Sequence, residues 1–128
     1  CNRSDGLGLG LLRKAGLPML ILSKEQDPVV DVRARKLGIE SISGVEDKLA
    51  VLKKWLSDRA ISPAGVVYVG NDVNDLDCMR YVGCGVAVGD AHPSVRASAN
   101  VVLRRAGGAG AVRELTDMIL PILAGGRQ

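Results

Sequence analysis

The stretch that decides the fold reads Val66-Val67-Tyr68-Val69-Gly70-Asn71-Asp72-Val73-Asn74-Asp75. It begins with a run of β-branched and aromatic residues, which predicts a buried strand over residues 66–69. The run breaks at Gly70 into residues 71–75, called the acidic turn below. The apolar residues that follow are spaced as on one face of a helix, at Leu76, Met79 and Val82. The stretch therefore predicts a strand, an acidic turn and a helix.

The acidic turn has two interpretations. Open α/β sheets bind ligands at the carboxyl ends of their strands, and oxygen ligands without a His or Cys cluster suit a hard cation such as Mg²⁺. In that case Asn71, Asp72 and Asp75 are candidate metal ligands. The plainer alternative is an Asn/Asp-rich turn followed by a helix N-cap. We favour the metal site because the turn carries four Asn and Asp residues, more than one cap requires.

The rest of the chain alternates in the same way between apolar segments and polar breaks. Continuous or alternating apolar runs predict further strands over residues 19–22, 39–43, 86–88 and 101–103. Helically spaced apolar residues predict further helices over residues 7–15, 28–37, 46–60, 93–99 and 112–119. Strands and helices that alternate about every 20 residues predict an α/β fold with a mostly parallel sheet.

The composition limits the class of protein. At 128 residues we expect one domain, with an aliphatic core because the chain has one Trp, two Tyr and no Phe. The net charge is only +3 and the basic residues are scattered, so no nucleic-acid partner is expected. Three cysteines without a C-x-x-C motif favour a reducing compartment and a cytoplasmic protein. No apolar run approaches the roughly 18 residues of a membrane span, so no membrane partner is expected.

Further candidate residues follow the other predicted strands. Ser23 and Asp90 come just after strands, and Lys48 lies early in the helix after the second strand. A hydroxyl, an ammonium group and a metal turn at one edge of a sheet suit phosphoryl chemistry, because they offset or bind the charge on the phosphate oxygens. Each residue also has a plainer interpretation: Ser23 could end a strand, Lys48 could lie on the surface, and Asp90 could cap a helix. His92 is expected to be a loop residue, and Cys78 and Cys84 small core residues.

The order of serine, lysine and acidic turn resembles that of the haloacid dehalogenase superfamily of phosphatases. Residues 20–23, Lys48 and residues 70–75 resemble its second, third and fourth motifs. The resemblance is strongest to the capless branch that includes 3-deoxy-manno-octulosonate 8-phosphate and nonulosonate 9-phosphate phosphatases, of which residues 3–8 and 107–114 are typical. The chain also resembles the dehalogenase-type domain of some N-acylneuraminate cytidylyltransferases.

This resemblance implies a Rossmann-like fold and an Mg²⁺-dependent phosphatase that acts on a phosphorylated sugar acid. Ser23 and Lys48 would bind the phosphoryl group as catalytic residues, and Asn71, Asp72 and Asp75 would hold the metal. The resemblance to this branch implies a tetramer in which neighbouring subunits cover the active site, and therefore a homo-oligomer.

The chain departs from the family pattern in two ways. Asn71 stands where the fourth motif usually has Asp, and its uncharged amide is expected to bind Mg²⁺ more weakly. The first motif, Asp-x-Asp-Gly, which supplies the aspartyl nucleophile, occurs nowhere in the sequence. Because that motif ends a central strand, we expect residues 1–128 to be a single domain truncated by about 30–40 residues at its N-terminus. Two strands would then lack their shared neighbour, and the 128 residues alone would be inactive.

Two other classes of function compete with the phosphatase. A non-catalytic oligomerisation domain of an N-acylneuraminate cytidylyltransferase is mildly favoured by Asn71. A receiver-like α/β domain also uses carboxylates, a hydroxyl and a lysine. Its acidic residues would follow the first strand and its lysine would come last, which is the opposite of the order here.

Overall fold

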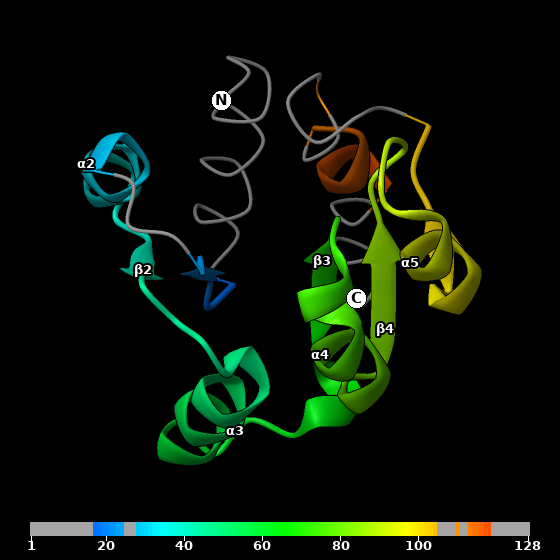
Figure 1. Cartoon of the computed structure of the whole chain (residues 1–128). Coiled ribbons are helices and arrows are strands. Elements are labelled where there is room, and N and C mark those ends of the chain that lie inside the picture. Colours follow the sequence, from blue (N-terminus) through cyan, green and yellow to red (C-terminus); the bar gives the residue numbers. More distant parts are fainter. Residues whose placement is uncertain (1–16, 25–27, 105–109, 111–112, 119–128) are drawn as a thin grey trace, which may run out of the picture. The chain divides into compact units, whose positions relative to one another are not determined.

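The computed structural model describes residues 17–24, 28–104, 110 and 113–118. The chain divides into two compact units, residues 1–44 with 108–128 and residues 45–107. Figure 1 follows the elements along the chain. Because each unit is described by itself, the expectation of one domain truncated at its N-terminus stays a prediction. No helix among the described residues is long and apolar enough to cross a membrane.

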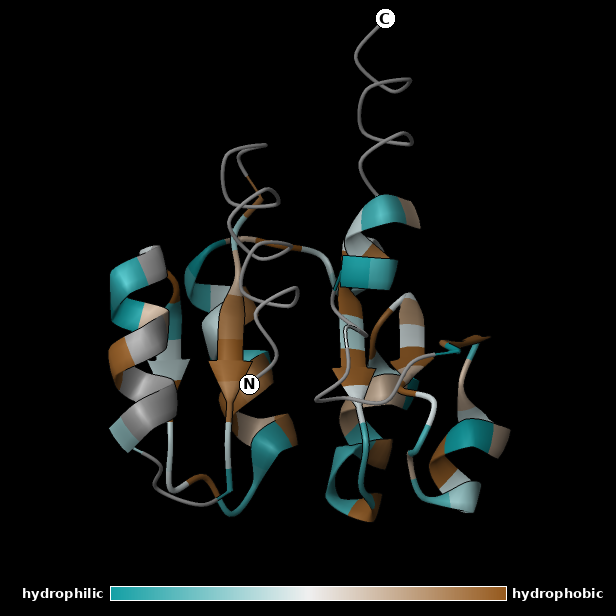
Figure 2. Ribbon diagram, turned by 90° about the horizontal axis from the view of Figure 1, so that it is seen from above, coloured by the Kyte–Doolittle hydropathy of each residue, from teal (hydrophilic) through white to brown (hydrophobic). Residues whose placement is uncertain are grey.

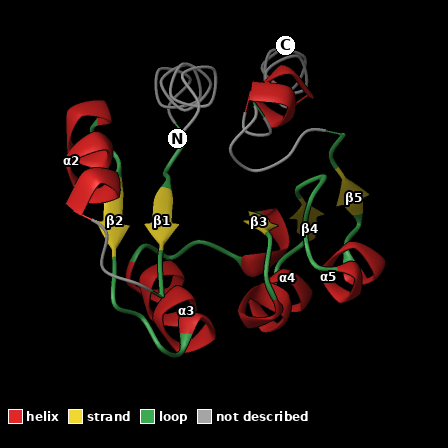
Figure 3. Ribbon diagram, turned by 45° about the horizontal axis from the view of Figure 1, so that its top comes forward, coloured by secondary structure: helices red, strands yellow, loops and turns green. Residues whose placement is uncertain are grey.

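The first unit contains a parallel strand pair connected by a helix. Its elements are β1 (Leu20–Leu22), α2 (Pro28–Leu37) and β2 (Glu40–Ile42). The two strands pair in parallel with Leu20 opposite Glu40 (Figure 3). Gly38, at a φ of 72°, follows the helix in a left-handed conformation that suits glycine. A further helical segment, residues 113–118, belongs to this unit.

The second unit carries most of the described elements. They are α3 (Lys48–Asp58), η1 (Pro63–Gly65), β3 (Val67–Gly70), η2 (Val73–Asp75), α4 (Leu76–Tyr81), β4 (Cys84–Ala87), α5 (Pro93–Ser98) and β5 (Val101–Val102). The strands form a parallel sheet in the order β3-β4-β5. Because β4 lies in the middle, it is the most buried of the three.

The core of the second unit is aliphatic, as the composition predicts. Val86 of β4, Val95 of α5 and Leu103 after β5 are at most 2% exposed. The helices α4 and α5 both contact β4, so the middle strand is covered by the apolar sides of two helices. Figure 2 shows the apolar residues in brown along the strands.

The fold class is confirmed, with parallel strands that alternate with helices. The described strands form two sheets, β1-β2 in the first unit and β3-β4-β5 in the second. Several boundaries differ from the prediction by one or two residues, and the largest difference among the strands is at β4. It begins at Cys84, two residues before the predicted start, because Cys84 and Gly85 pair with β3. The helix predicted over residues 7–15 and the stretch 3–8 lie outside the described residues.

Candidate functional site

A glycine precedes the acidic turn because the chain folds back tightly on itself there. A Cβ atom added at Gly70 would lie 2.7 Å from Cβ of Asp75 and 2.7 Å from Sδ of Met79. Both contacts are far closer than carbon and sulfur atoms tolerate. Gly70 therefore lets the side chain of Asp75 lie directly against the end of β3.

The turn is held partly as a helix cap. Oδ1 of Asp72 accepts a hydrogen bond from the backbone N–H of Val73 at 2.7 Å. Oδ2 of Asp75 accepts from the backbone N–H groups of Asn71 at 3.0 Å and Asp72 at 3.2 Å. The bond from the Asp72 backbone to Asp75 is one half of a capping box at the start of η2, and in the other half the side chain of Asp72 accepts from the backbone N–H of Asp75. The plainer interpretation of the turn is therefore part of its structure.

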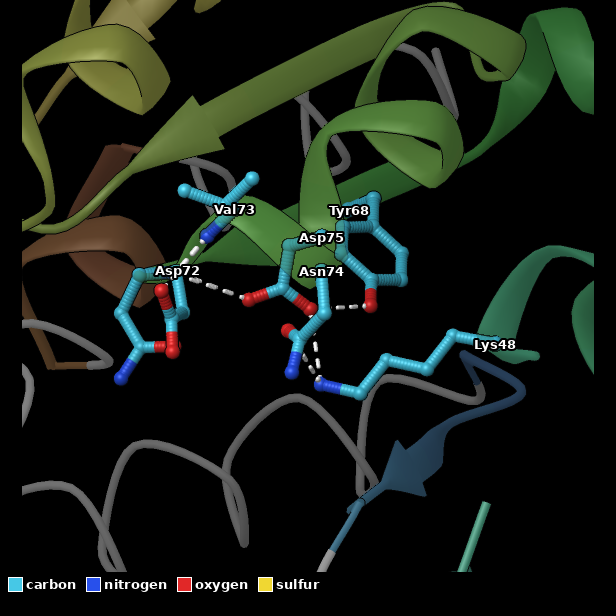
Figure 4. A network of polar contacts seen from close by, with 7 residues as sticks. Lys48, Tyr68, Asp72, Val73, Asn74 and Asp75 are labelled. Atoms are coloured by element: carbon cyan, nitrogen blue, oxygen red, sulfur yellow. Dashed lines mark hydrogen bonds and ion pairs between the residues drawn. The ribbon is translucent and has the colours of Figure 1, made fainter. Parts of the chain in front are cut away.

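A cap does not account for the other oxygen of Asp75. Oδ1 accepts hydrogen bonds from Nζ of Lys48 at 2.9 Å and from the hydroxyl of Tyr68 at 2.7 Å (Figure 4). Nζ of Lys48 also donates to Oδ1 of Asn74 at 3.3 Å. The side chains of Lys48 and Asp75 are only 10% and 4% exposed. Asp75 thus joins the first residue of α3, the strand β3 and the turn in one buried network.

The charge of Asp75 is stabilised by these donors. Burial alone would raise its pKa, but hydrogen bonds from Lys48, Tyr68 and the backbone of Asn71 outweigh burial and hold the pKa below the usual range. Burial raises the pKa of the Tyr68 hydroxyl, and its bond to the charged Asp75 raises that pKa further. Asp75 is therefore the anion of the pair and Tyr68 the neutral donor.

The structure brings some of the predicted site residues together. Lys48 and Asp75 are in direct contact, and Asn71 and Asp72 lie exposed at the start of the same turn. Ser23 directly follows β1, as predicted, and its backbone N–H donates to the carbonyl of Ile42 at 3.0 Å. Ser23 belongs to the other unit, so its convergence with Lys48 stays a prediction.

The helix α5 begins differently from the prediction. His92 lies in the loop before the helix, as expected, and it is also the N-cap, because its Nδ1 accepts from the backbone N–H of Ser94 at 3.2 Å. Pro93 occupies the first helical position, which makes the preceding residue the cap. Asp90 lies two residues too early for that position. The backbone N–H of His92 also donates to the carbonyl of Asn71 at 3.0 Å.

The sequence patterns do not predict two members of the network. They place Tyr68 only in the strand and Asn74 only in the turn. A tyrosine inside a buried strand requires a partner for its hydroxyl, and the nearest acidic residues are those of the turn. That requirement could have identified Tyr68, whereas nothing local identifies Asn74 as a partner of Lys48.

The described residues could supply part of a metal site. No group of three or more His, Cys, Asp or Glu side chains in the part of the chain that the structure describes could hold a metal ion. The carboxylate of Asp72 and the amide of Asn71 are exposed hard oxygen donors. A magnesium ion is commonly held by one or two carboxylates, with waters and substrate phosphate completing its six ligands. The exposed oxygens of Asn71 and Asp72 are therefore chemically suited to be the protein's contribution to a magnesium site.

Comparison with known proteins agrees with the motif order and the geometry. Residues 33–115 match the family of haloacid dehalogenase-like hydrolases. The chain belongs to this family. The motifs proposed for the family include both Lys48 and the acidic turn, and these are the residues that the structure joins through Asp75.

The relatives include enzymes with an assigned substrate. The chain is 39% identical over 120 residues to 3-deoxy-D-manno-octulosonate 8-phosphate phosphatase KdsC of Escherichia coli K12, covering 93% of this chain but 64% of that protein. A HAD family hydrolase structure from Streptomyces avermitilis is 53% identical, with a TM-score of 0.90 over 95% of this chain and 71% of that one.

A third similar structure contains ligands. It is the 3-deoxy-D-manno-octulosonate 8-phosphate phosphatase of Moraxella catarrhalis, in complex with magnesium ion, phosphate ion and KDO. That chain is 32% identical, with a TM-score of 0.90 over 99% of this chain and 77% of its own. The present chain spans less than two thirds of the length of the curated relatives that it matches.

Proposed function

We propose that the protein containing this chain is an Mg²⁺-dependent phosphatase that hydrolyses a phosphorylated sugar acid of the 3-deoxy-octulosonate 8-phosphate or nonulosonate 9-phosphate type. The observation that carries the proposal is the buried Lys48–Asp75 pair at the carboxyl end of β3. It occurs in a chain 39% identical to a phosphatase for the first of these substrates. A buried lysine held by a carboxylate at a strand end is suited to binding an anion.

Lys48 and Ser23 are the proposed phosphate-binding residues. An ammonium group has three N–H donors, and two of those of Lys48 are directed to Asp75 and Asn74. The third is left for a phosphoryl oxygen, where the positive charge offsets the negative charge that the oxygen carries. The hydroxyl of Ser23 would donate to another oxygen of the same group.

The residues proposed for the metal site are Asn71, Asp72 and Asp75, in two different roles. Each oxygen of Asp75 already accepts two hydrogen bonds, so Asp75 would act mainly by fixing the turn. The exposed oxygens of Asn71 and Asp72 would contact the ion directly. When bound, Mg²⁺ would neutralise charge on the phosphoryl group.

The proposed reaction also needs a nucleophile. The sequence contains no Asp-x-Asp-Gly, so we propose that an aspartate outside the 128 residues attacks phosphorus. The phosphorus–oxygen bond to the sugar acid breaks, and water then hydrolyses the aspartyl phosphate to release inorganic phosphate. We propose a homotetramer in which a neighbouring subunit covers the site.

The test is an assay of the protein produced from its natural coding sequence. Phosphate release from 3-deoxy-octulosonate 8-phosphate and from a nonulosonate 9-phosphate is measured with Mg²⁺, and again with excess EDTA. We expect release from one of the two substrates that EDTA abolishes. Absence of release from both would refute the proposal.

Asn71 supports one alternative. An uncharged amide in place of a carboxylate weakens cation binding, as a domain without catalysis could tolerate. The alternative is a non-catalytic oligomerisation domain of an N-acylneuraminate cytidylyltransferase. A nucleotide-binding domain encoded in the same gene, together with a tetramer that releases no phosphate, would favour it.

A further inference from the structure

The proposed reaction assigns no role to Tyr68, although this residue contacts the carboxylate at the centre of the site. It is part of β3, and its hydroxyl donates to Oδ1 of Asp75 at 2.7 Å. The helix α4, which contains the fully buried Cys78, packs against β3. Figure 4 shows the Tyr68 hydroxyl directed at the carboxylate that Lys48 also contacts. The phenol thus connects the core of the unit to the centre of the polar network.

Each of the two carboxylate oxygens of Asp75 accepts hydrogen bonds from its own pair of donors. Oδ2 faces the backbone N–H groups of Asn71 and Asp72, and Oδ1 faces Lys48 and Tyr68. The torsion that rotates a carboxylate about its last bond has a broad energy profile. Only fixed donors can therefore hold its orientation. Lys48 is a long, flexible side chain, whereas Tyr68 is a rigid ring anchored in a strand.

We propose that Tyr68 is a positioning residue. Its hydroxyl fixes the orientation of the Asp75 carboxylate and thereby keeps the Lys48 ammonium and the acidic turn in fixed positions relative to each other. The expected effect of Tyr68 on activity rests on the proposed phosphatase function. Its expected effect on the hydrogen bonds around Asp75 is independent of that function. Tyr68 itself touches neither substrate nor metal.

The test compares the two tyrosines of the chain. Tyr68→Phe and Tyr81→Phe each remove one phenolic oxygen, but Tyr81 is exposed and its ring lies 5.0 Å from Nζ of Lys53. In the full-length protein, kcat/KM is expected to fall about tenfold for Tyr68→Phe, the effect of one hydrogen bond to a charged group. Tyr81→Phe should stay within about twofold of the wild type. Equal values for the two variants would overturn the proposal.

A second readout needs no activity. The NMR signals of the Asn71 and Asp72 backbone amides and of the Lys48 ammonium group report the bonds to Asp75. All three should shift in Tyr68→Phe and remain unchanged in Tyr81→Phe; unshifted signals in Tyr68→Phe refute positioning. If the wild type releases no phosphate, the proposed function fails while these signals still decide the role of Tyr68.

If Tyr68→Phe does not fold, the hydrogen bond can be tested by NMR in the wild-type protein. A hydroxyl proton held by a carboxylate exchanges slowly with water, and its replacement by deuterium changes the ¹³C signal of the acceptor. A slowly exchanging Tyr68 hydroxyl with such an isotope shift at Asp75 supports the proposal. A freely exchanging hydroxyl without it overturns the proposal.

Discussion

Two strand ends of the second unit look alike in sequence but differ in structure. The strand β3 ends at Gly70 and is followed by the acidic turn, whereas β4 is followed by residues 88–92 and the start of α5. The first turn is built on a carboxylate that is 3% exposed and accepts from four donors, two of them side chains outside the turn. The second is capped by the exposed ring of His92, which accepts from the backbone of Ser94.

The difference in donors distinguishes a simple helix cap from a candidate functional site. A helix cap needs only donors from the residues that immediately follow it. Asp75 additionally has the ammonium of Lys48, 27 residues earlier in the chain, and the hydroxyl of Tyr68 on the strand. Burying a lysine and a carboxylate together costs desolvation and is weak evidence for stability alone. The burial of this pair at the end of β3 is therefore better explained by function.

The largest expected effect is that of Asp75→Asn. The substitution removes the anion and leaves the ammonium of Lys48 buried without a counter-charge, at a cost of about 3–5 kcal/mol in the free energy of unfolding. The matched change at the other turn, Asp90→Asn, affects an exposed residue and should cost about 0.5 kcal/mol or less. Urea unfolding of both variants measures the difference, and similar losses would remove the distinction between the turns.

Gly70→Ala should have the next largest effect. Its Cβ would overlap Asp75 and Met79, and overpacking of this kind costs about 1–3 kcal/mol. Gly65→Ala is the control, since nothing lies within 4 Å of a Cβ there. The midpoint of urea unfolding should fall for the first variant and hardly change for the second. An unaffected Gly70→Ala would mean that Asp75 does not lie against the end of β3.

His92→Ala tests the other strand end and should have the smallest effect. Loss of a helix cap costs about 1 kcal/mol, and only the local bond to Ser94 is removed. The bond from the backbone of His92 to Asn71 does not involve the ring, so the NMR signals of the Asn71 and Asp72 amides should keep their positions. A large shift of these signals would show that the two turns act as one.

Local sequence patterns predicted the elements, and the motif order predicted the proximity of Lys48 to the acidic turn. The run before Gly70 and the apolar spacing after it gave β3 and α4, because both patterns depend on near neighbours in the chain. The motif order singled out Lys48 together with the turn. The spacing of Asp72 and Asp75 is also that of a capping box, so the plainer interpretation of the turn is confirmed, while the metal site stays a prediction.

The roles within the turn could not be predicted in this way. Asp72 and Asp75 are chemically the same, and only the backbone path decides that one is exposed and the other buried. The donors to Asp75 come from a helix and a strand whose approach depends on tertiary packing. The cap at His92 was missed because residue preferences favour Asp, whereas the position of Pro93 decides which residue is the cap.

The most direct test of the account is the activity of Lys48→Met in the full-length protein. Lys48 is buried against Asp75, whereas Lys53 on the same helix is exposed over the ring of Tyr81, so Lys53→Met is the matched control. We predict that kcat/KM for the sugar-acid phosphate falls about 100-fold or more for Lys48→Met, as when a positioned charge-stabilising group is removed. Lys53→Met should stay within about twofold of the wild type. Equal activity of the two variants would contradict a phosphoryl site at the end of β3.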